Sequence, residues 1–154
     1  MSRKSLKLGI IGGGQLGMFI AKSAMNQKIV PYVYSDTQDA PAKKYAHKII
    51  YGKFDDKEKL SVFFSEVDVI TYEFENIPYE TLNEMNKLKS VLPKPSVNRL
   101  IQHRLAEKDF INKLNIRTTR YVSIEKKSDI ETLGDFLPGI LKTTTMGYDG
   151  KGQY

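Results

Sequence analysis

The glycine-rich segment Gly12–Gly17 constrains the fold of this chain most, because it separates a short apolar run from an amphipathic one. Leu6–Ile11 is predicted to be a buried strand, and Gln15–Asn26 carries apolar residues at helical spacing. The glycines fall in the order G-x-G-x-x-G, which lets a strand turn tightly into a helix. The free N–H groups of such a helix attract an anion. This segment therefore predicts an α/β fold with a phosphate-bearing ligand at its first turn.

The same alternation of strands and helices continues to residue 95. Strands are predicted at 29–35, 47–51, 67–72 and 91–92, helices at 57–65 and 78–87, and a turn or short helix at 39–45. Close alternation of this kind is typical of βαβ units with a parallel sheet. We therefore predict a Rossmann-like domain over residues 1–95.

The rhythm changes after Pro95. Ser96 is predicted to cap a helix at 97–103, followed by helices at 105–114 and 128–136 and strands at 118–122 and 139–143. A glycine-rich segment follows the last of these, and such segments normally join two elements. Residues 96–154 are therefore predicted to be the start of a second unit that does not close its own core.

Composition excludes several classes of function. The chain has 154 residues and no cysteine, which rules out disulfides, thiolate catalysis and cysteine-based zinc sites. Its net charge of +6 is spread along the chain without a basic, aromatic stripe, so we expect no nucleic-acid partner. No apolar run reaches the ~20 residues that span a bilayer, and we expect a cytoplasmic protein. His47 and His103 lack metal-ligand spacing, which favours structural roles.

Polar residues after two of the predicted strands are candidates for ligand binding. Asp36 ends the second strand, 19 residues past Gly17, where a Rossmann unit places an acid for ribose hydroxyls. Glu73 and Asn76 follow the strand at 67–72 and are suited to ribose hydroxyls and amino groups. The alternatives are a glycine turn without a ligand and a plain turn before Pro78. Position alone does not separate NAD from a phosphoribosyl compound.

A second glycine-rich segment, Gly147–Gln153, predicts a flap over a polyphosphate, with Lys142 as a phosphate-contacting charge. It is not a Walker loop, because no Ser or Thr follows Lys151. The alternative is a flexible polar hairpin turn with Lys142 as an ordinary lysine at a strand end.

Four ordered motifs resemble the 5-(carboxyamino)imidazole ribonucleotide synthase family, the ATPase subunit of phosphoribosylaminoimidazole carboxylase. They are Gly12–Gly17 (GGGQLG), Tyr72–Asn76 (YEFEN), Arg104–Lys108 (RLAEK) and Gly147–Gln153 (GYDGKGQ). Asp39–Ala42 also matches the family segment after the second strand. The resemblance runs over essentially the whole chain, and it implies a Rossmann-like pre-ATP-grasp domain followed by the truncated start of an ATP-grasp domain.

The resemblance also implies the role of each candidate residue. The 5′-phosphate of aminoimidazole ribonucleotide would face Gly14, Gln15 and Leu16, and the ribose and aminoimidazole would be lined by Asp36, Glu73 and Asn76. ATP would be held by Arg104, Lys142 and the flap residues Gly147, Tyr148, Asp149, Gly150, Lys151, Gly152 and Gln153.

The implied reaction is that of an ATP-dependent ligase of purine biosynthesis. Magnesium-bound ATP would phosphorylate bicarbonate to carboxyphosphate, which carboxylates the amine of the ribonucleotide; NAD takes no part. Family members are more than twice as long and usually homodimers, so the catalytic residues and magnesium ligands are expected beyond Tyr154, and the fragment is expected to be inactive alone.

Two other functions stay open from the sequence. An NAD(P)-binding oxidoreductase domain would explain Gly12–Asp36 but not the second glycine segment. The second alternative is a non-catalytic remnant that only binds ligand.

Met146 departs from the family, which usually has glycine or a small residue there.

Overall fold

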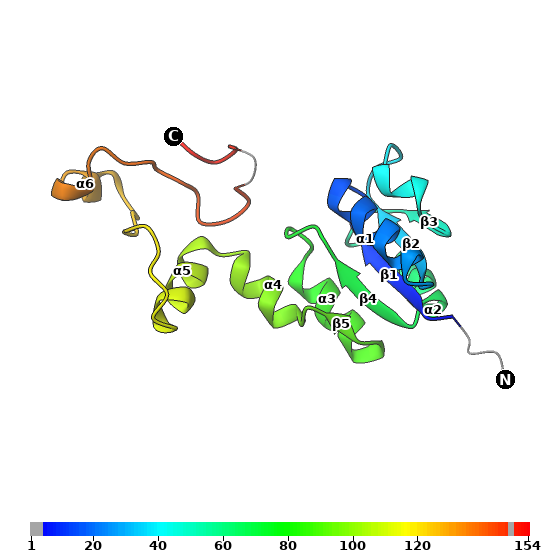
Figure 1. Cartoon of the computed structure of the whole chain (residues 1–154). Helices are drawn as coiled ribbons and strands as arrows, with labels where there is room; N and C mark the ends of the chain where they lie inside the picture. Colours follow the sequence, from blue (N-terminus) through cyan, green and yellow to red (C-terminus); the bar gives the residue numbers. More distant parts are fainter. Residues whose placement is uncertain (1–4, 148–149) are drawn as a thin grey trace. The chain divides into compact units, whose positions relative to one another are not determined.

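In a computed structural model, residues 5–147 and 150–154 are described, and they form two compact units divided between Asn98 and Arg99. Figure 1 shows the order of the elements along the chain. The first unit contains β1 (Lys7–Ile11), α1 (Gln15–Asn26), β2 (Val30–Ser35), the 3₁₀ helix η1 (Pro41–Lys44), β3 (Lys48–Tyr51), α2 (Lys57–Glu66), β4 (Val69–Tyr72), α3 (Tyr79–Leu88), β5 (Val91–Leu92) and the start of α4 (Pro95–Ile101).

The five strands form one parallel sheet in the order β3-β2-β1-β4-β5. This confirms the predicted α/β fold class. The strand order reverses between β1 and β4, so the sheet has a topological switch point there. Ile11 at the end of β1 pairs with Tyr34 of β2 and Tyr72 of β4, which brings the carboxyl ends of three strands to one edge.

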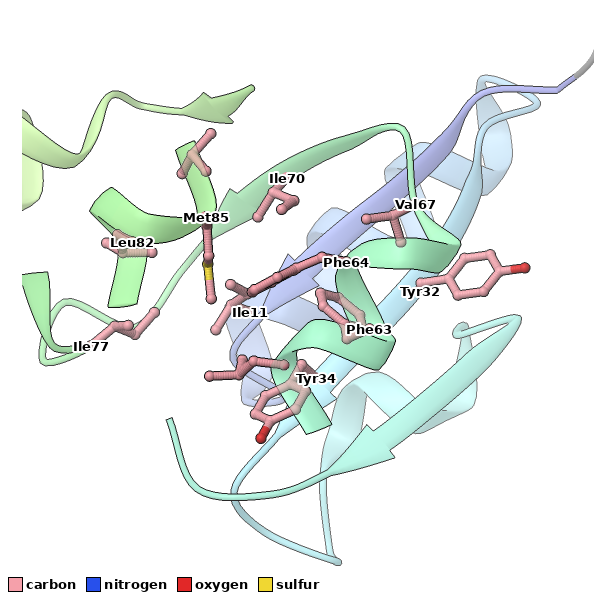
Figure 2. Packing of buried hydrophobic residues seen from close by; sticks show 12 residues of the cluster. Ile11, Tyr32, Tyr34, Phe63, Phe64, Val67, Ile70, Ile77, Leu82 and Met85 are labelled. Atoms are coloured by element: carbon pink, nitrogen blue, oxygen red, sulfur yellow. The ribbon is translucent and has the colours of Figure 1, made fainter. Parts of the chain in front are cut away.

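Successive residues of the central strands point to opposite faces of the sheet and build two cores. Ile11 and Tyr34 pack with α2 and α3 in a cluster that includes Phe63 and Met85, as Figure 2 shows. Ile10 and Val33 face the other way and pack with α1 and η1. The near-continuous apolar strands of this unit are typical of a sheet covered on both faces.

The second unit begins at Arg99 and contains short helices and the second glycine-rich segment. Its elements are the end of α4, α5 (Arg104–Lys113), α6 (Lys127–Ile130) and the 3₁₀ helix η2 (Gly134–Phe136). None of its described residues is buried.

Several predictions for residues 95–143 are wrong. Ser96 does not cap α4, because the helix already begins at Pro95, whose fixed φ suits a first helical position. The predicted helix at 128–136 is divided into α6 and η2, and Gly134 with φ +47° interrupts the helical path.

The predicted strands at 118–122 and 139–143 do not form either. Side chains of α5 hold the first segment: Asn112 donates to the Thr118 hydroxyl at 3.3 Å, and Lys108 donates to the Thr119 carbonyl at 3.1 Å. Of the second segment, only Lys142 forms an isolated bridge, with Gln153. A strand depends on a neighbouring ladder, and the described part of this unit offers none beyond that bridge.

Candidate functional site

The candidate site of the first unit lies at the switch point, beyond the carboxyl ends of β1 and β4. Ile11 and Tyr72 are the paired last residues of these strands, so Gly12 and Glu73 leave the sheet side by side. The Glu73 N–H donates to the Ile11 carbonyl at 3.0 Å, and the Gly12 N–H donates to the Tyr34 carbonyl at 2.9 Å. Parallel pairing thus brings together two motifs that are about sixty residues apart in sequence.

The Glu73 side chain then folds back onto the glycine loop. Its Oε1 accepts a hydrogen bond from the Gly14 N–H at 3.1 Å. A Cβ on Gly12 would lie 2.6 Å from this oxygen, and Gly12 has a φ of +108° that L side chains rarely adopt. A Cβ on Gly17 would lie 2.3 Å from the Gly12 carbonyl oxygen. The glycine pattern is therefore required by the protein's own packing, whatever ligand the loop binds.

The electrostatics of the loop combine a positive helix end with a half-buried acid. Gly14 caps α1 without a side-chain hydrogen bond, and the first turn contains no acidic residue. The first N–H groups of a helix have no partner inside it, so this end can accept an anion. Burial raises the pKa of the Glu73 carboxyl above its usual range; the Gly14 N–H opposes this rise and the charge of Asp36 adds to it.

The other predicted residues of the first unit are placed less closely. Gln15 and Leu16 are exposed on the first turn of α1, and the Leu16 side chain is 61% exposed. Asp36 is exposed at the end of β2 and acts on Glu73 through its charge. The Asn76 amide nitrogen is buried without a hydrogen-bond partner among the described residues, so no hydrogen bond of this nitrogen joins it to the glycine loop.

Sequence reasoning missed two buried polar residues that support this edge. Asn98 is fully buried, and its side chain donates to the Glu75 carbonyl at 2.9 Å, which fixes the turn after Glu73. Ser35 is also fully buried beneath Gly13, where a Cβ on the glycine would lie 2.5 Å from the serine oxygen. The only sequence signal for Asn98 is a polar residue at an inward helical position.

In the second unit, Arg104 lies against the segment before the flap. Its N–H donates to the Thr144 carbonyl at 2.8 Å, and its Nε donates to the Thr143 carbonyl at 3.4 Å. Arg104 also opens α5, which places the guanidinium and this segment together although they are about forty residues apart. The structure thus brings Arg104 next to the segment that leads into the flap, and its predicted role at ATP stays a prediction.

Lys142 and the end of the flap pair in antiparallel fashion. Lys142 forms a bridge with Gln153, and the Thr143 N–H donates to the Gly152 carbonyl at 2.8 Å. Gly150 and Gly152 have φ values of +81° and +68°, and Met146 has +58°. The departure at Met146 therefore falls on a backbone conformation that favours glycine. Tyr148 and Asp149 lie outside the described residues.

The described residues contain neither a metal-binding cluster nor a membrane-spanning helix. No group of three or more His, Asp or Glu residues lies close enough there to hold a metal ion. Helices long and apolar enough to cross a membrane are also lacking there.

Residues 5–102 match the ribonucleotide synthetase preATP-grasp domain. The chain belongs to this family. The N5-carboxyaminoimidazole ribonucleotide synthase of Staphylococcus epidermidis is 39% identical to it over 150 residues, which are 95% of this chain and 40% of that protein. This preATP-grasp chain thus spans about two fifths of the length of that relative.

Solved structures give the same family. The N5-carboxyaminoimidazole synthetase of Staphylococcus aureus, complexed with ADP, matches 99% of this chain and 42% of its own, with a TM-score of 0.88 and 34% identity. The Aspergillus clavatus N5-carboxyaminoimidazole synthase, in complex with ADP and 5-aminoimidazole ribonucleotide, matches 97% and 40%, with a TM-score of 0.80 and 25% identity. The preATP-grasp chain is therefore similar to the N-terminal part of ATP-dependent ligases of purine biosynthesis.

Proposed function

We propose that residues 5–98 bind 5-aminoimidazole ribonucleotide for an ATP-dependent N5-carboxyaminoimidazole ribonucleotide synthase. The observation that carries this proposal is the meeting of the glycine loop with Glu73 at the switch point of a preATP-grasp domain. Ligands of open α/β sheets bind at such switch points, beyond the carboxyl ends of the strands. The relative from Aspergillus clavatus, crystallised with this ribonucleotide, supports the choice of ligand.

Each part of the ribonucleotide has a chemical counterpart in this site. The N–H groups of Gly14, Gln15 and Leu16 suit the 5′-phosphate, because the N-cap Gly14 offers no side chain to the start of α1. The carboxylates of Asp36 and Glu73 suit the ribose hydroxyls and the amine as hydrogen-bond acceptors. The Asn76 amide nitrogen, buried without a partner among the described residues, would gain one from the ligand.

The second unit contributes to ATP binding in this proposal. Arg104 and Lys142 supply positive charge to the phosphates, and Gly147–Gln153 covers them with backbone N–H groups. Relatives crystallised with ADP or ATP support a nucleotide here. In this proposal, residues 1–95 form the substrate-binding domain, and residues 96–154 form the beginning of an ATP-grasp subdomain that binds ATP.

The complete reaction needs more protein than these 154 residues. Bicarbonate would be phosphorylated by ATP to carboxyphosphate, which carboxylates the substrate amine, while magnesium offsets charge on the phosphoryl group. We propose that the magnesium ligands and the catalytic groups belong to the part of the enzyme that relatives have in addition. The chain alone is then inactive, and the full-length enzyme is a cytoplasmic homodimer that does not use NAD.

An amide-resolved NMR titration of the 154-residue chain tests the substrate assignment. Aminoimidazole ribonucleotide is added to one sample and NADH to another, with ribose as a control that lacks the phosphate. We expect shifts at Gly14–Gly17, Asp36 and Glu73–Asn76 with the ribonucleotide and none with NADH. Shifts at the same loop with NADH alone would favour a dehydrogenase domain and overturn the proposal.

A further inference from the structure

The glycine loop already holds an anion that belongs to the protein itself. Glu73 Oε1 accepts the hydrogen bond of the Gly14 N–H at 3.1 Å, and Gly14 is the N-cap residue of α1. This N–H is one of the groups that a bound phosphate would need. The fit is close, since a Cβ on Gly14 would lie only 3.1 Å from the same oxygen.

The contact also shapes the loop around the carboxylate. The position of a Cβ on Gly12 is 2.6 Å from Glu73 Oε1, and that on Gly17 is 3.5 Å from Glu73 Cγ. Three glycines of the loop thus leave space for this one side chain. The main chain of Glu73 is fixed by its hydrogen bond to Ile11, so rotation of the side chain alone would release the Gly14 N–H.

We propose that Glu73 acts as an internal placeholder for the ligand phosphate, and that an anion binds the loop only when the carboxylate leaves Gly14 or takes up a proton. The inference rests on the proposed function, because it assumes that the loop receives the phosphate. Two negative groups at one N–H cannot both be held there at low cost. Without substrate, the Glu73 carboxylate occupies the Gly14 N–H. A ligand that offers Glu73 a hydrogen-bond donor in exchange is therefore favoured.

Proton uptake is the physical consequence of this competition. Among the described residues, the charge of Asp36 at the end of β2 acts on Glu73, and Gly12, Gly14 and Gly17, which lie against Glu73, carry no titratable side chain. Burial already raises the pKa of Glu73, and an anion at the loop would raise it further. Anion affinity must then fall as pH rises through the titration of Glu73.

Sulfate is a suitable probe, because its charge stays constant between pH 4 and pH 8. Its affinity is measured at constant ionic strength from the amide shifts of Gly14, Gln15 and Leu16 in the 154-residue chain. The variants are Glu73→Gln and, as a matched control, Glu80→Gln, which removes one exposed charge on the first turn of α3. In the unmodified chain and in E80Q, we expect affinity to fall from pH 4 to pH 8 by about tenfold, which corresponds to a rise of about one in the pKa of Glu73 when sulfate binds. In E73Q we expect this Glu73-dependent fall to be absent.

The unmodified chain offers a second readout if E73Q folds poorly. By linkage, sulfate must raise the pKa of Glu73, which the side-chain carboxyl ¹³C resonance reports directly. Equal affinity in E73Q and the unmodified chain at pH 8, with clear shifts at Gly14, would overturn the placeholder and leave the phosphate site standing. No shift at residues 14–17 with any variant at any pH would overturn the phosphate site itself.

Discussion

Residues 5–98 and the described residues after Asn98 reach order by different physical routes. Every described hydrophobic side chain that is buried lies between Ile10 and Val91, whereas no described residue after Asn98 is buried. The second unit nevertheless keeps the helix α5, and both of its ends gain hydrogen bonds from residues close in sequence. The Ala106 N–H reaches the His103 ring at 3.4 Å, and Asn115 with φ +61° lets the Ile116 N–H reach the Ile111 carbonyl at 3.3 Å.

Strands show the opposite behaviour in the two units. In the first unit, each predicted strand has a parallel neighbour and forms. In the second, the segments at 118–122 and 139–143 carry exposed apolar side chains such as Val122 and Ile140, at 45% and 69% exposure. A helix forms its backbone hydrogen bonds within its own segment, but a strand needs a partner from elsewhere in the chain.

The largest expected effect compares one phenylalanine from each unit. Phe63 on α2 is fully buried and packs edge-on against Tyr34 at 5.6 Å, whereas Phe110 on α5 is 47% exposed. We expect Phe63→Ala to lower the free energy of unfolding by about 3–5 kcal/mol. Phe110→Ala should change it by less than about 0.5 kcal/mol. Urea unfolding followed by far-UV circular dichroism measures both, and a large loss in F110A would show that this side chain is covered in solution.

A smaller effect is expected from replacing two glycines, Gly17, which leaves no space for a Cβ, and Gly134, which has a positive φ. In a helix, Gly17→Ala should be favourable by propensity, but its Cβ would meet the Gly12 carbonyl oxygen, so we expect a loss of about 1–3 kcal/mol. Gly134 has no atom within 4 Å of its Cβ position and φ +47°. Gly134→Ala should therefore loosen only its own turn, by about 1 kcal/mol. Amide exchange of Leu137, which donates to Gly134 at 3.1 Å, measures that loss. Unchanged stability in G17A would contradict the observed packing of the loop.

The smallest expected effect compares two tyrosine hydroxyls. Tyr34 is fully buried and donates to the Lys53 carbonyl at 2.8 Å, so Tyr34→Phe should cost about 1 kcal/mol at neutral pH. Burial, with Asp56 and Asp55, raises the pKa of Tyr34 to about 12. The folded pKa exceeds the unfolded one, so stability is intact below pH 10 and falls as pH rises toward 12.

Y34F should remove that alkaline loss, which unfolding curves at pH 9 to 12 measure. The matched variant is Tyr121→Phe in the second unit. The Tyr121 hydroxyl donates to Asp109, which raises its pKa, but the group is solvent-exposed. We expect no measurable change in unfolding with Y121F. An alkaline transition that persists in Y34F would show that another group is responsible for it.

The candidate site was predicted from sequence as a set of residues, not as an arrangement. The sequence pointed to the Gly12–Gly17 loop, Asp36 and Glu73, because each follows a predicted strand and parallel strands end at one edge of the sheet. The hydrogen bond from Gly14 to Glu73 could not be predicted, since it spans fifty-nine positions and depends on side-chain direction. Asn98 was missed for the same reason, because a buried amide looks like any polar helix residue.

Sequence alone determined the α/β class, the glycine turn into α1 and the family, since these depend on local apolar periodicity and on motifs close in the chain. Tertiary structure decided which strands exist and that Glu73 occupies the loop it was expected to share with a ligand. Hydrogen-bond ladders and buried contacts join distant residues, and their free energy is gained only when the partner is present.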